Sequence, residues 1–336
     1  MNKFRTFSIV SASLLAFTLY GCDKGKTAST PTPAPAPKTA TAPETITFTK
    51  AALYPEGLEY DAKRNHFLVT SMHEGIIGEV SDDGAYKVFA QNPNFVSAVG
   101  IRIDAERDRL LVCNSDPGVS IHTKKENQGK LAGLGIFQLS TGKLIKYLDL
   151  GKLGGAGGHF CNDIALDSAG NAYVTDSFSP IIYKVDTANN ASILLNDKRF
   201  TGEGFNLNGI VVKDNYLLVA KYNEGLLFKV PLDKPEQFTQ VKIKETLVGA
   251  DGLLWAPDGT LVVIANLTTN KVFKLASNDN WTSASVIGSV DTGEVFATTG
   301  VVRDGKIYAL YAMLHVLFNP ETKTQIEKFE IHQQNL

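Results

Sequence analysis

Hydrophobic and polar positions repeat along the chain in six similar units. Each unit opens with a short segment in which a glycine, or once an aspartate, is followed by an apolar residue, and four of the segments close on an aspartate. The segments cover residues 56–61, 99–104, 162–167, 208–213, 251–256 and 299–304, and their starts lie 43, 63, 46, 43 and 48 residues apart. Repeats at such periods are typical of proteins built from copies of one small unit.

Each opening segment is followed by a turn and by further apolar runs. The turns at 167–171, 257–259 and 304–305 contain the Asp, Asn and Gly residues that suit tight hairpins. The second runs are rich in Val, Leu and Tyr, which favour strands, and cover 66–70, 109–114, 171–176, 216–221, 260–266 and 306–311. Third runs follow at 75–80, 134–139, 180–185, 225–230, 270–275 and 314–319. More polar fourth runs close the units, for example at 85–90, 143–150 and 324–331.

Six units of four strands each predict an all-β fold, a six-bladed β-propeller with four antiparallel strands per blade, over residues 45–336. No stretch of the chain shows sustained helical periodicity. The second unit is the longest, and its excess lies in the polar, Gly-rich stretch 115–133. This stretch is either a solvated loop or a loop over the tunnel mouth. The sequence does not decide whether 45–50 adds a closing strand to the last blade.

The first 21 residues are predicted to be a targeting segment. Lys3 and Arg5 precede an apolar stretch at 7–20, which is short for a membrane span. The stretch ends at Gly21-Cys22, which resembles the lipobox of bacterial lipoproteins, so we predict cleavage before Cys22 and lipidation of its thiol. The alternatives are an ordinary secretory signal or an uncleaved anchor. One acylated terminus anchors a protein to a membrane without spanning it.

Residues 22–44 are rich in proline and read as an extended stalk between the lipidated cysteine and the folded body. The predicted location is therefore the bacterial cell envelope, exported and lipid-anchored, on the periplasmic face of a membrane in a Gram-negative host. The two remaining cysteines, Cys113 and Cys161, either form a disulfide, which export permits, or are two buried free thiols.

Composition narrows the function classes. The chain has 336 residues, of which 43% are hydrophobic and 20% charged, with a formal net charge of −2, as in soluble globular proteins. Nucleic acid is not an expected partner, because binding it requires a basic face that neutralises phosphates.

The innermost strand of each propeller blade lines the central axis, so equivalent positions from different blades converge on one ring. The first residues of the repeated segments occupy this ring, and they are Glu56, Val99, Asn162, Asn208, Asp251 and Thr299. Four of them carry a carboxylate or a carboxamide, the oxygen donors that calcium and other hard divalent cations prefer. The two carboxylates balance the charge of such an ion. Alternatively, these groups bridge neighbouring blades or hold ordered water.

The chain resembles the SMP-30/gluconolactonase/LRE-like superfamily, and more distantly the paraoxonases, over about residues 50–331. The resemblance is carried by the stretches 55–57, 162–163, 172–176, 208–209, 251–252 and 257–259. The resemblance implies a six-bladed propeller with calcium at the tunnel mouth, held by Glu56, Asn162, Asn208 and Asp251. It also implies hydrolysis of lactones or related esters, with Asp251 as general base or as the residue that positions water.

The chain departs from the paraoxonases at several positions. Val99 and Ser115 stand where those enzymes carry histidines, and Gly57 stands where their second calcium has an acid, so we predict no His dyad and no second calcium. His159 either replaces the missing base in the substrate pocket or is an exposed loop histidine after the glycine-rich stretch 154–158.

The ends of the second strands return to the tunnel mouth. We therefore predict that Asn114, Asp176, Lys221, Tyr222 and Asn266 line the substrate pocket. Two functions remain open: a calcium-dependent hydrolase of a small lactone or ester, or a non-catalytic propeller that binds a ligand or protein partner, with structural calcium. A deep polar well favours the enzyme, whereas a plugged tunnel with a broad apolar rim favours the binding module.

Overall fold

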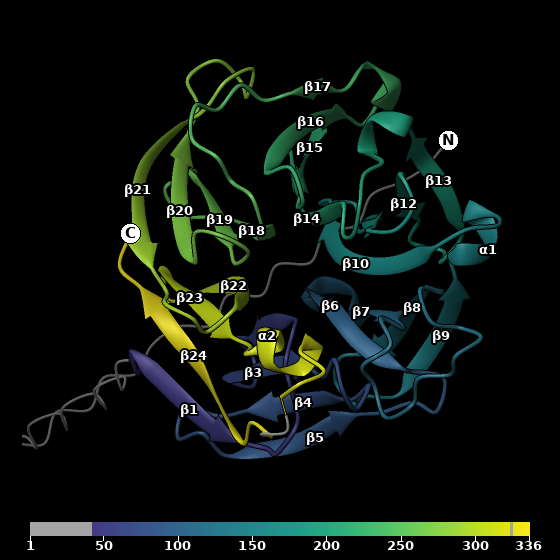
Figure 1. The fold of residues 1–336 in the computed structure, drawn as a ribbon, viewed down its shortest axis with the longest axis vertical. Helices are drawn as coiled ribbons and strands as arrows, with labels where there is room; N and C mark the ends of the chain where they lie inside the picture. The colour runs from purple at the N-terminus through teal and green to yellow at the C-terminus, as the bar shows by residue number, and fades with distance from the viewer. Residues whose placement is uncertain (1–41, 323–324) are drawn as a thin grey trace, which may run out of the picture. The chain divides into compact units, whose positions relative to one another are not determined.

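The first strand of each repeated unit lies nearest the central axis, and the later strands follow outward (Figure 1). The computed structural model describes residues 42–322 and 325–336. The innermost strands are β2 (Leu58–Asp61), β6 (Ser97–Asp104), β10 (His159–Leu166), β14 (Leu207–Lys213), β18 (Ala250–Trp255) and β22 (Ala297–Arg303). The predicted signal peptide at 1–21, Cys22 and the linker up to residue 41 lie outside the described residues.

Hairpins lead from each innermost strand to its neighbours. The second strands are β3 (His66–Thr70), β7 (Arg109–Ser115), β11 (Ala172–Asp176), β15 (Tyr216–Lys221), β19 (Leu261–Ala265) and β23 (Lys306–Tyr311). The third strands are β4 (Ile77–Val80), β8 (Lys130–Gln138), β12 (Ile181–Val185), β16 (Leu226–Pro231), β20 (Lys271–Ala276) and β24 (Lys328–Gln334). The outermost strands are β5 (Tyr86–Ala90), β9 (Leu144–Asp149), β13 (Ala191–Asn196), β17 (Thr239–Gln240), β21 (Ser285–Asp291) and β1 (Thr45–Thr49).

The strands of the described residues form four separate four-stranded sheets and one eight-stranded sheet. The larger sheet consists of the meanders β6–β9 and β10–β13, which are joined where His159 and Phe160 of β10 pair in parallel with Lys130 and Leu131 of β8. The prediction of an all-β propeller with a four-stranded unit is confirmed. The prediction of six separate blades is confirmed only in part, because two of the units share one sheet.

The last sheet is closed by the two ends of the described chain. β1 pairs with β24, with Thr45 opposite His332 and Thr49 opposite Lys328, so the closing strand that the sequence left undecided is present. The assignments of 314–319 and 324–331 as third and fourth strands are wrong. Residues Leu314–Phe318 form the short helix α2, and β24 occupies the third position. The chain leaves the sheet at Met313, whose backbone is left-handed (φ 57°) and whose N–H donates to Val295.

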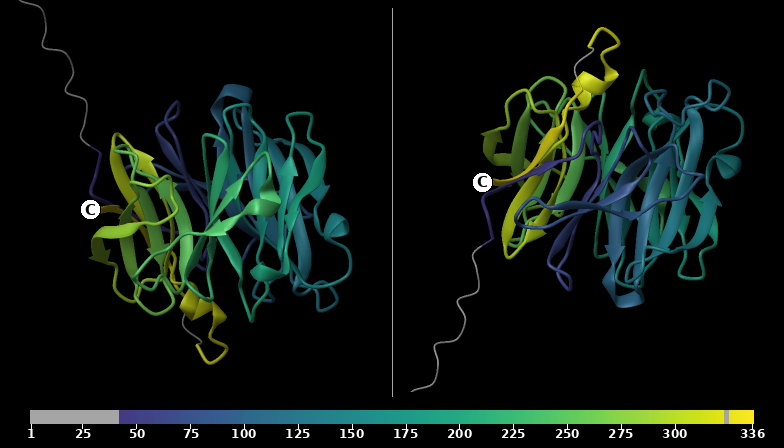
Figure 2. Two further views of the ribbon diagram at one scale, coloured as in Figure 1. Left: turned by 90° about the horizontal axis from the view of Figure 1, so that it is seen from above. Right: turned by 90° about the horizontal axis from the view of Figure 1, so that it is seen from below.

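The α2 segment stands out on one face of the ring of sheets, where it is drawn in yellow (Figure 2). The other short helices are α1 (Gly151–Gly154), η1 (Ala105–Arg107), η2 (Lys198–Phe200) and η3 (Pro235–Gln237). Within the described residues, no helix has both the length and the apolar character needed to cross a membrane.

Bulges in the innermost strands aim the ring residues at the axis. The pairing register shifts at 98–101, 161–164, 207–210, 250–253 and 297–300, and each shift skips the ring residue of its strand. Residues in a bulge leave the hydrogen-bonded ladder, so their side chains can be re-aimed.

The glycines that follow the ring residues permit the strands to approach one another closely. A Cβ at Gly57 would lie 2.5 Å from the carbonyl oxygen of Val99, and one at Gly209 would lie 2.0 Å from that of Asp251. Only glycine tolerates such backbone contact. The glycine of the repeat is therefore explained by packing around the axis.

A disulfide joins Cys113 of β7 to Cys161 of β10, with 5.3 Å between the two Cα atoms. The sequence left open whether these cysteines were bridged or free. The bridge ties the second unit to the third and precedes the ring residue Asn162 by one position.

Candidate metal centre

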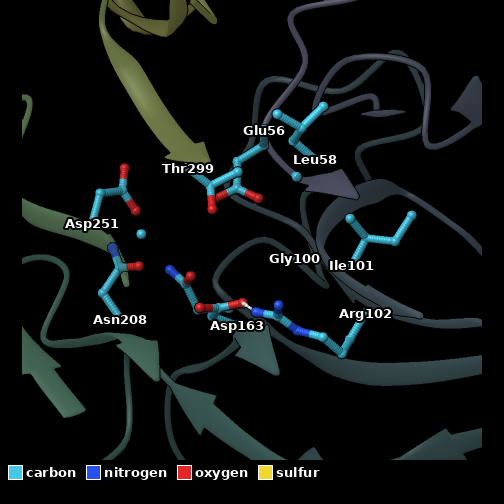
Figure 3. A pocket seen from close by; sticks show the side chains of 12 residues that line it. Glu56, Leu58, Gly100, Ile101, Arg102, Asp163, Asn208, Asp251 and Thr299 are labelled. Atoms are coloured by element: carbon cyan, nitrogen blue, oxygen red, sulfur yellow. Dashed lines mark ion pairs between the residues drawn. The ribbon is translucent and has the colours of Figure 1, made fainter. Parts of the chain in front are cut away.

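Five of the six ring residues meet around one small cavity on the axis (Figure 3). Glu56, Asn162, Asn208, Asp251 and Thr299 line it, while Val99 faces the mouth instead. The cavity volume is about 10 Å³, roughly that needed to hold one water molecule or a single ion. Glu56, Asn162, Asn208 and Asp251 are between 4% and 7% exposed. The repeat therefore brings the predicted oxygen donors together in a buried site.

Two oxygen atoms of the ring lack a hydrogen-bond partner among the described residues. They are Glu56 Oε2 and Asn162 Oδ1. Asn162 is oriented by its own amide, since Nδ2 donates to Ser177 Oγ at 2.9 Å. A buried acceptor without a partner costs free energy. A cation or an ordered water in the cavity would satisfy both oxygens.

The two ring carboxylates favour a bound positive charge. Burial, together with the charges of Asp251 and Asp163, holds the pKa of Glu56 well above its usual range. Burial also raises the pKa of Asp251 to about 7, although a hydrogen bond from Asn266 acts in the opposite direction. Both groups must therefore bind a proton or another cation to remain buried at low energetic cost.

Asn266 and Tyr222 orient Asp251. Asn266 Nδ2 donates to Asp251 Oδ2 at 2.5 Å and to the carbonyl of Ala297 at 2.9 Å. Tyr222 donates its hydroxyl hydrogen to Asn266 Oδ1 at 2.8 Å, which fixes the orientation of the amide. Of the predicted pocket residues, Tyr222 lines the mouth, whereas Asn266 lies behind Asp251.

A partly buried ion cluster lies on the tunnel side of the ring. The guanidinium of Arg102 is 2.8 Å from Glu59 Oε1. It is also 3.9 Å from Asp163 Oδ1 (Figure 3). Asp163 also accepts hydrogen bonds from the N–H groups of Ile164 and Ile210. Burial raises the pKa of Glu59 to about 7 even though Arg102 opposes the shift. Sequence reasoning missed Arg102, although its position in the repeat placed it two residues from a ring glycine.

On the opposite side of the ring, the mouth of the tunnel is apolar. Its walls are Met72, Val99, Phe160, Phe205, Tyr222, Phe296, Leu314 and Phe318, and its floor is formed by Glu56, Asn162, Asn208 and Asp251. Sequence reasoning found the floor but, apart from Tyr222, did not assign the aromatic walls to the pocket. The walls come mainly from loops and from α2, which the repeat does not predict.

Five of the six predicted pocket residues do not line the mouth, and they are Asn266, already described, and Asn114, His159, Asp176 and Lys221. Asn114 is buried in contacts with Asn94, Val96 and Tyr147. The Lys221 ammonium donates to the carbonyl of Thr201 at 2.8 Å and pairs with Glu224 at 2.6 Å. Both side chains are held by structural contacts, so their assignment to the pocket is corrected.

His159 and Asp176 form a second buried pair outside the mouth. His159 Nδ1 is 2.7 Å from Asp176 Oδ2, and His159 Nε2 is 3.1 Å from the carbonyl of Gly155. The hydrogen bond to Asp176 raises the pKa of His159. His159 is 3% exposed, so it is neither an exposed loop residue nor a base at the mouth. Asp176 also accepts the N–H of Phe160 and thereby helps to place that wall residue.

The described residues contain no group of three or more His, Cys, Asp or Glu side chains placed to hold a metal ion. The ring instead offers two carboxylates, two carboxamides and the hydroxyl of Thr299. Such an all-oxygen set suits calcium better than zinc. The unpaired oxygens of Glu56 and Asn162 make the set compatible with a cation, and they do not identify one.

No protein-family model and no curated protein matches the sequence. Among solved structures, the major allergen Mala s 1 of Malassezia sympodialis has a TM-score of 0.69 and 17% identity over 88% of this chain and 97% of that one. A luciferin-regenerating enzyme has a TM-score of 0.60 and 10% identity over 87% and 97%. A calcium-binding regucalcin from Agrobacterium tumefaciens has a TM-score of 0.57 and 16% identity over 84% and 91%. At these identities the likeness is one of fold, and it confirms that this chain shares its propeller with luciferin-regenerating enzyme and regucalcin.

Proposed function

We propose that the chain is a six-bladed, calcium-dependent hydrolase of lactones or related esters, exported and anchored in the cell envelope by lipidated Cys22. The observation that carries this proposal is the pair of unpartnered oxygens, Glu56 Oε2 and Asn162 Oδ1, in a buried cavity that Asp251 and Asn208 also line. Buried acceptors of this kind require a partner, and a cation in the cavity would supply one to both oxygens.

Calcium would be held by Glu56, Asn162, Asn208 and Asp251. All four present oxygen donors, and the two carboxylates match the charge of a divalent ion. When bound, such an ion polarises a carbonyl and stabilises negative charge that develops on its oxygen. The calcium-binding regucalcin with the same fold supports this choice of ion.

The chain's own residues would bind substrate and move one proton. Asp251, whose carboxylate is oriented by the hydrogen bond from Asn266, would accept a proton from water. The water oxygen forms a bond to the carbonyl carbon, the bond from that carbon to the alkoxy oxygen breaks, and the proton passes to the leaving oxygen. Asn162 and Asn208 would orient the substrate beside Asp251.

The apolar walls of the mouth favour a second candidate, a non-catalytic propeller that binds an apolar ligand or a protein partner over a structural cation. This alternative shares the calcium ligands and the lipid anchor with the hydrolase. It differs in predicting no turnover of any bound ester. In either case the membrane is contacted through the lipid anchor, and nucleic acid is not a partner.

The deciding experiment is a hydrolysis assay on a panel of lactones and aryl esters. The full-length chain is treated with chelator and assayed with and without added calcium. We expect turnover only with calcium, and a loss of at least about a hundredfold in kcat for Asp251→Asn. Asp233→Asn, at an exposed position, is the matched control and should retain activity. Calcium binding without turnover of any member of the panel would favour the binding module.

A further inference from the structure

The walls of the mouth offer a substrate almost no free polar group. Of the twelve residues that line this pocket, four are polar residues of the ring, and the other eight, which include Val99 of the ring, are apolar or aromatic. The one hydroxyl among these eight, that of Tyr222, donates its hydrogen to Asn266. A ligand hydroxyl buried against these walls would lose its hydrogen bonds to water without replacing them, which is unfavourable.

The walls are held together by aromatic contacts that cross the mouth. The Phe205 ring lies 5.2 Å from that of Phe160 and 6.4 Å from those of Tyr222 and Phe318, measured between centroids. Phe318 comes from α2 of the last unit, whereas Phe205 precedes β14 of the fourth. The helix therefore extends the apolar surface from the ring out to the rim. If the carbonyl group of a ligand reached the ring, an apolar chain attached to it would contact these walls along its length.

We propose that the substrate is an ester or lactone with an unbranched alkyl chain or an aryl group attached near the carbonyl, and that polyhydroxylated sugar lactones are excluded. The choice of an ester or lactone as the reacting group rests on the proposed function. The choice of an apolar chain or aryl group rests on the walls of the mouth alone. Phe318 is the side chain that we assign to the outer end of the apolar chain, because it is 37% exposed and lies at the rim.

The test compares γ-lactones with alkyl chains of increasing length and glucono-δ-lactone, using the full-length chain with calcium. We expect kcat/KM to rise roughly fourfold for each added methylene until the mouth is filled, and glucono-δ-lactone to be at least about a hundredfold poorer than the best alkyl lactone. Phe318→Ala should lower kcat/KM about tenfold for long chains and much less for the shortest lactone. Ile287→Ala, at an exposed site on β21, is the control.

A binding arm separates this inference from the proposed function. Calorimetric titration with the lactams that correspond to the same lactones reports binding without hydrolysis. Chain-length-dependent binding of the lactams, with no lactone hydrolysed, would support the apolar mouth and overturn the hydrolase. Glucono-δ-lactone turned over as fast as the alkyl lactones would overturn the apolar substrate while leaving the hydrolase intact. Binding and turnover that are both independent of chain length would also overturn the apolar substrate.

Discussion

Asn266 donates a hydrogen bond to Asp251 across 2.5 Å, and the same nitrogen also reaches the carbonyl of Ala297 in the next sheet. This hydrogen bond favours the ionised form of Asp251, so it lowers a pKa that burial otherwise raises. Asn266→Ala should therefore move the pH at which calcium binding reaches half its maximum upward by about one unit. The measurement is calcium affinity against pH by calorimetry.

Tyr222→Phe provides the graded comparison, because it leaves Asn266 in place and removes only the hydroxyl that orients its amide. We expect a shift in the same direction as for Asn266→Ala but smaller. If Asn266→Ala lowers the melting temperature and leaves the pH midpoint unchanged, Asn266 is merely structural and does not tune Asp251.

The two ring carboxylates, Asp251 and Glu56, should make the stability of the fold depend on pH, and bound calcium should oppose this dependence. Without the ion, the folded-state pKa of Asp251 is about 7, against an ordinary value of 3.8, and that of Glu56 is also raised. The folded chain then holds more protons than the unfolded chain between about pH 4 and pH 7. The contribution of these groups to stability is therefore lost as the pH rises through that window. In chelator, the melting temperature should fall accordingly.

Above pH 7 the ring is ionised and ready to bind calcium, so added calcium should raise the melting temperature most there. At about one hundred times the dissociation constant the gain is roughly 2.7 kcal/mol, which corresponds to several degrees. Scanning calorimetry at several pH values, with chelator or calcium, measures both effects. Glu56→Gln should weaken the calcium response, and Glu245→Gln, at an exposed site, should preserve it. A calcium response that survives in Glu56→Gln and Asp251→Asn would place the cation elsewhere.

The disulfide between Cys113 and Cys161 should support both the fold and the ring. It closes a sequence separation of 48 residues and lies one residue from Asn162. Replacing both cysteines with serine should cost about 2–4 kcal/mol and weaken calcium binding, because Asn162 loses its tether to β7. Melting temperature with and without reductant measures the first effect, and reductant should not affect the double variant. Free thiols at both Cys113 and Cys161 in the denatured, unreduced chain would show that the bridge does not form.

The ring residues were predictable because the innermost strand of each unit packs against its neighbours in the same way. Glycine follows most ring residues since neighbouring strands approach too closely for a Cβ, as at Gly57 and Gly209. This constraint repeats with the blade, so aligning the glycines aligned Glu56, Asn162, Asn208 and Asp251 as well. Part of the candidate site was therefore predictable from the sequence because the contacts between neighbouring units repeat.

The mouth and the closing sheet were not predictable in this way. Leu314 and Phe318 form an apolar run like the third strands of other units, but the chain turns away from the sheet at Met313 and leaves the third position to β24. Asn114 and Lys221 lie at or next to the ends of second strands, yet local hydrogen bonds hold their side chains away from the mouth. Such partners come from loops that share no repeat, so the pattern contains no signal for them.

Arg102 should stabilise the fold by acting as the counter-ion of Glu59 and Asp163. Its guanidinium pairs with Glu59 at 2.8 Å and faces Asp163, while 26% of its side chain is exposed. Arg102→Met would leave both acids without their counter-ion. We expect a loss somewhat below the roughly 3–5 kcal/mol of a fully buried pair, measured by urea unfolding at pH 8.

The same substitution should cost less at low pH. Removing Arg102 raises the pKa of Glu59 further above its present value of about 7, so at pH 5.5 Glu59 is protonated and no longer requires a partner. Glu59→Gln combined with Arg102→Met should recover part of the stability lost at pH 8, because it removes one of the two unpaired charges. An equal loss at both pH values, with no recovery in the double variant, would mean that Arg102 acts through packing of its side chain and not as the counter-ion of the tunnel.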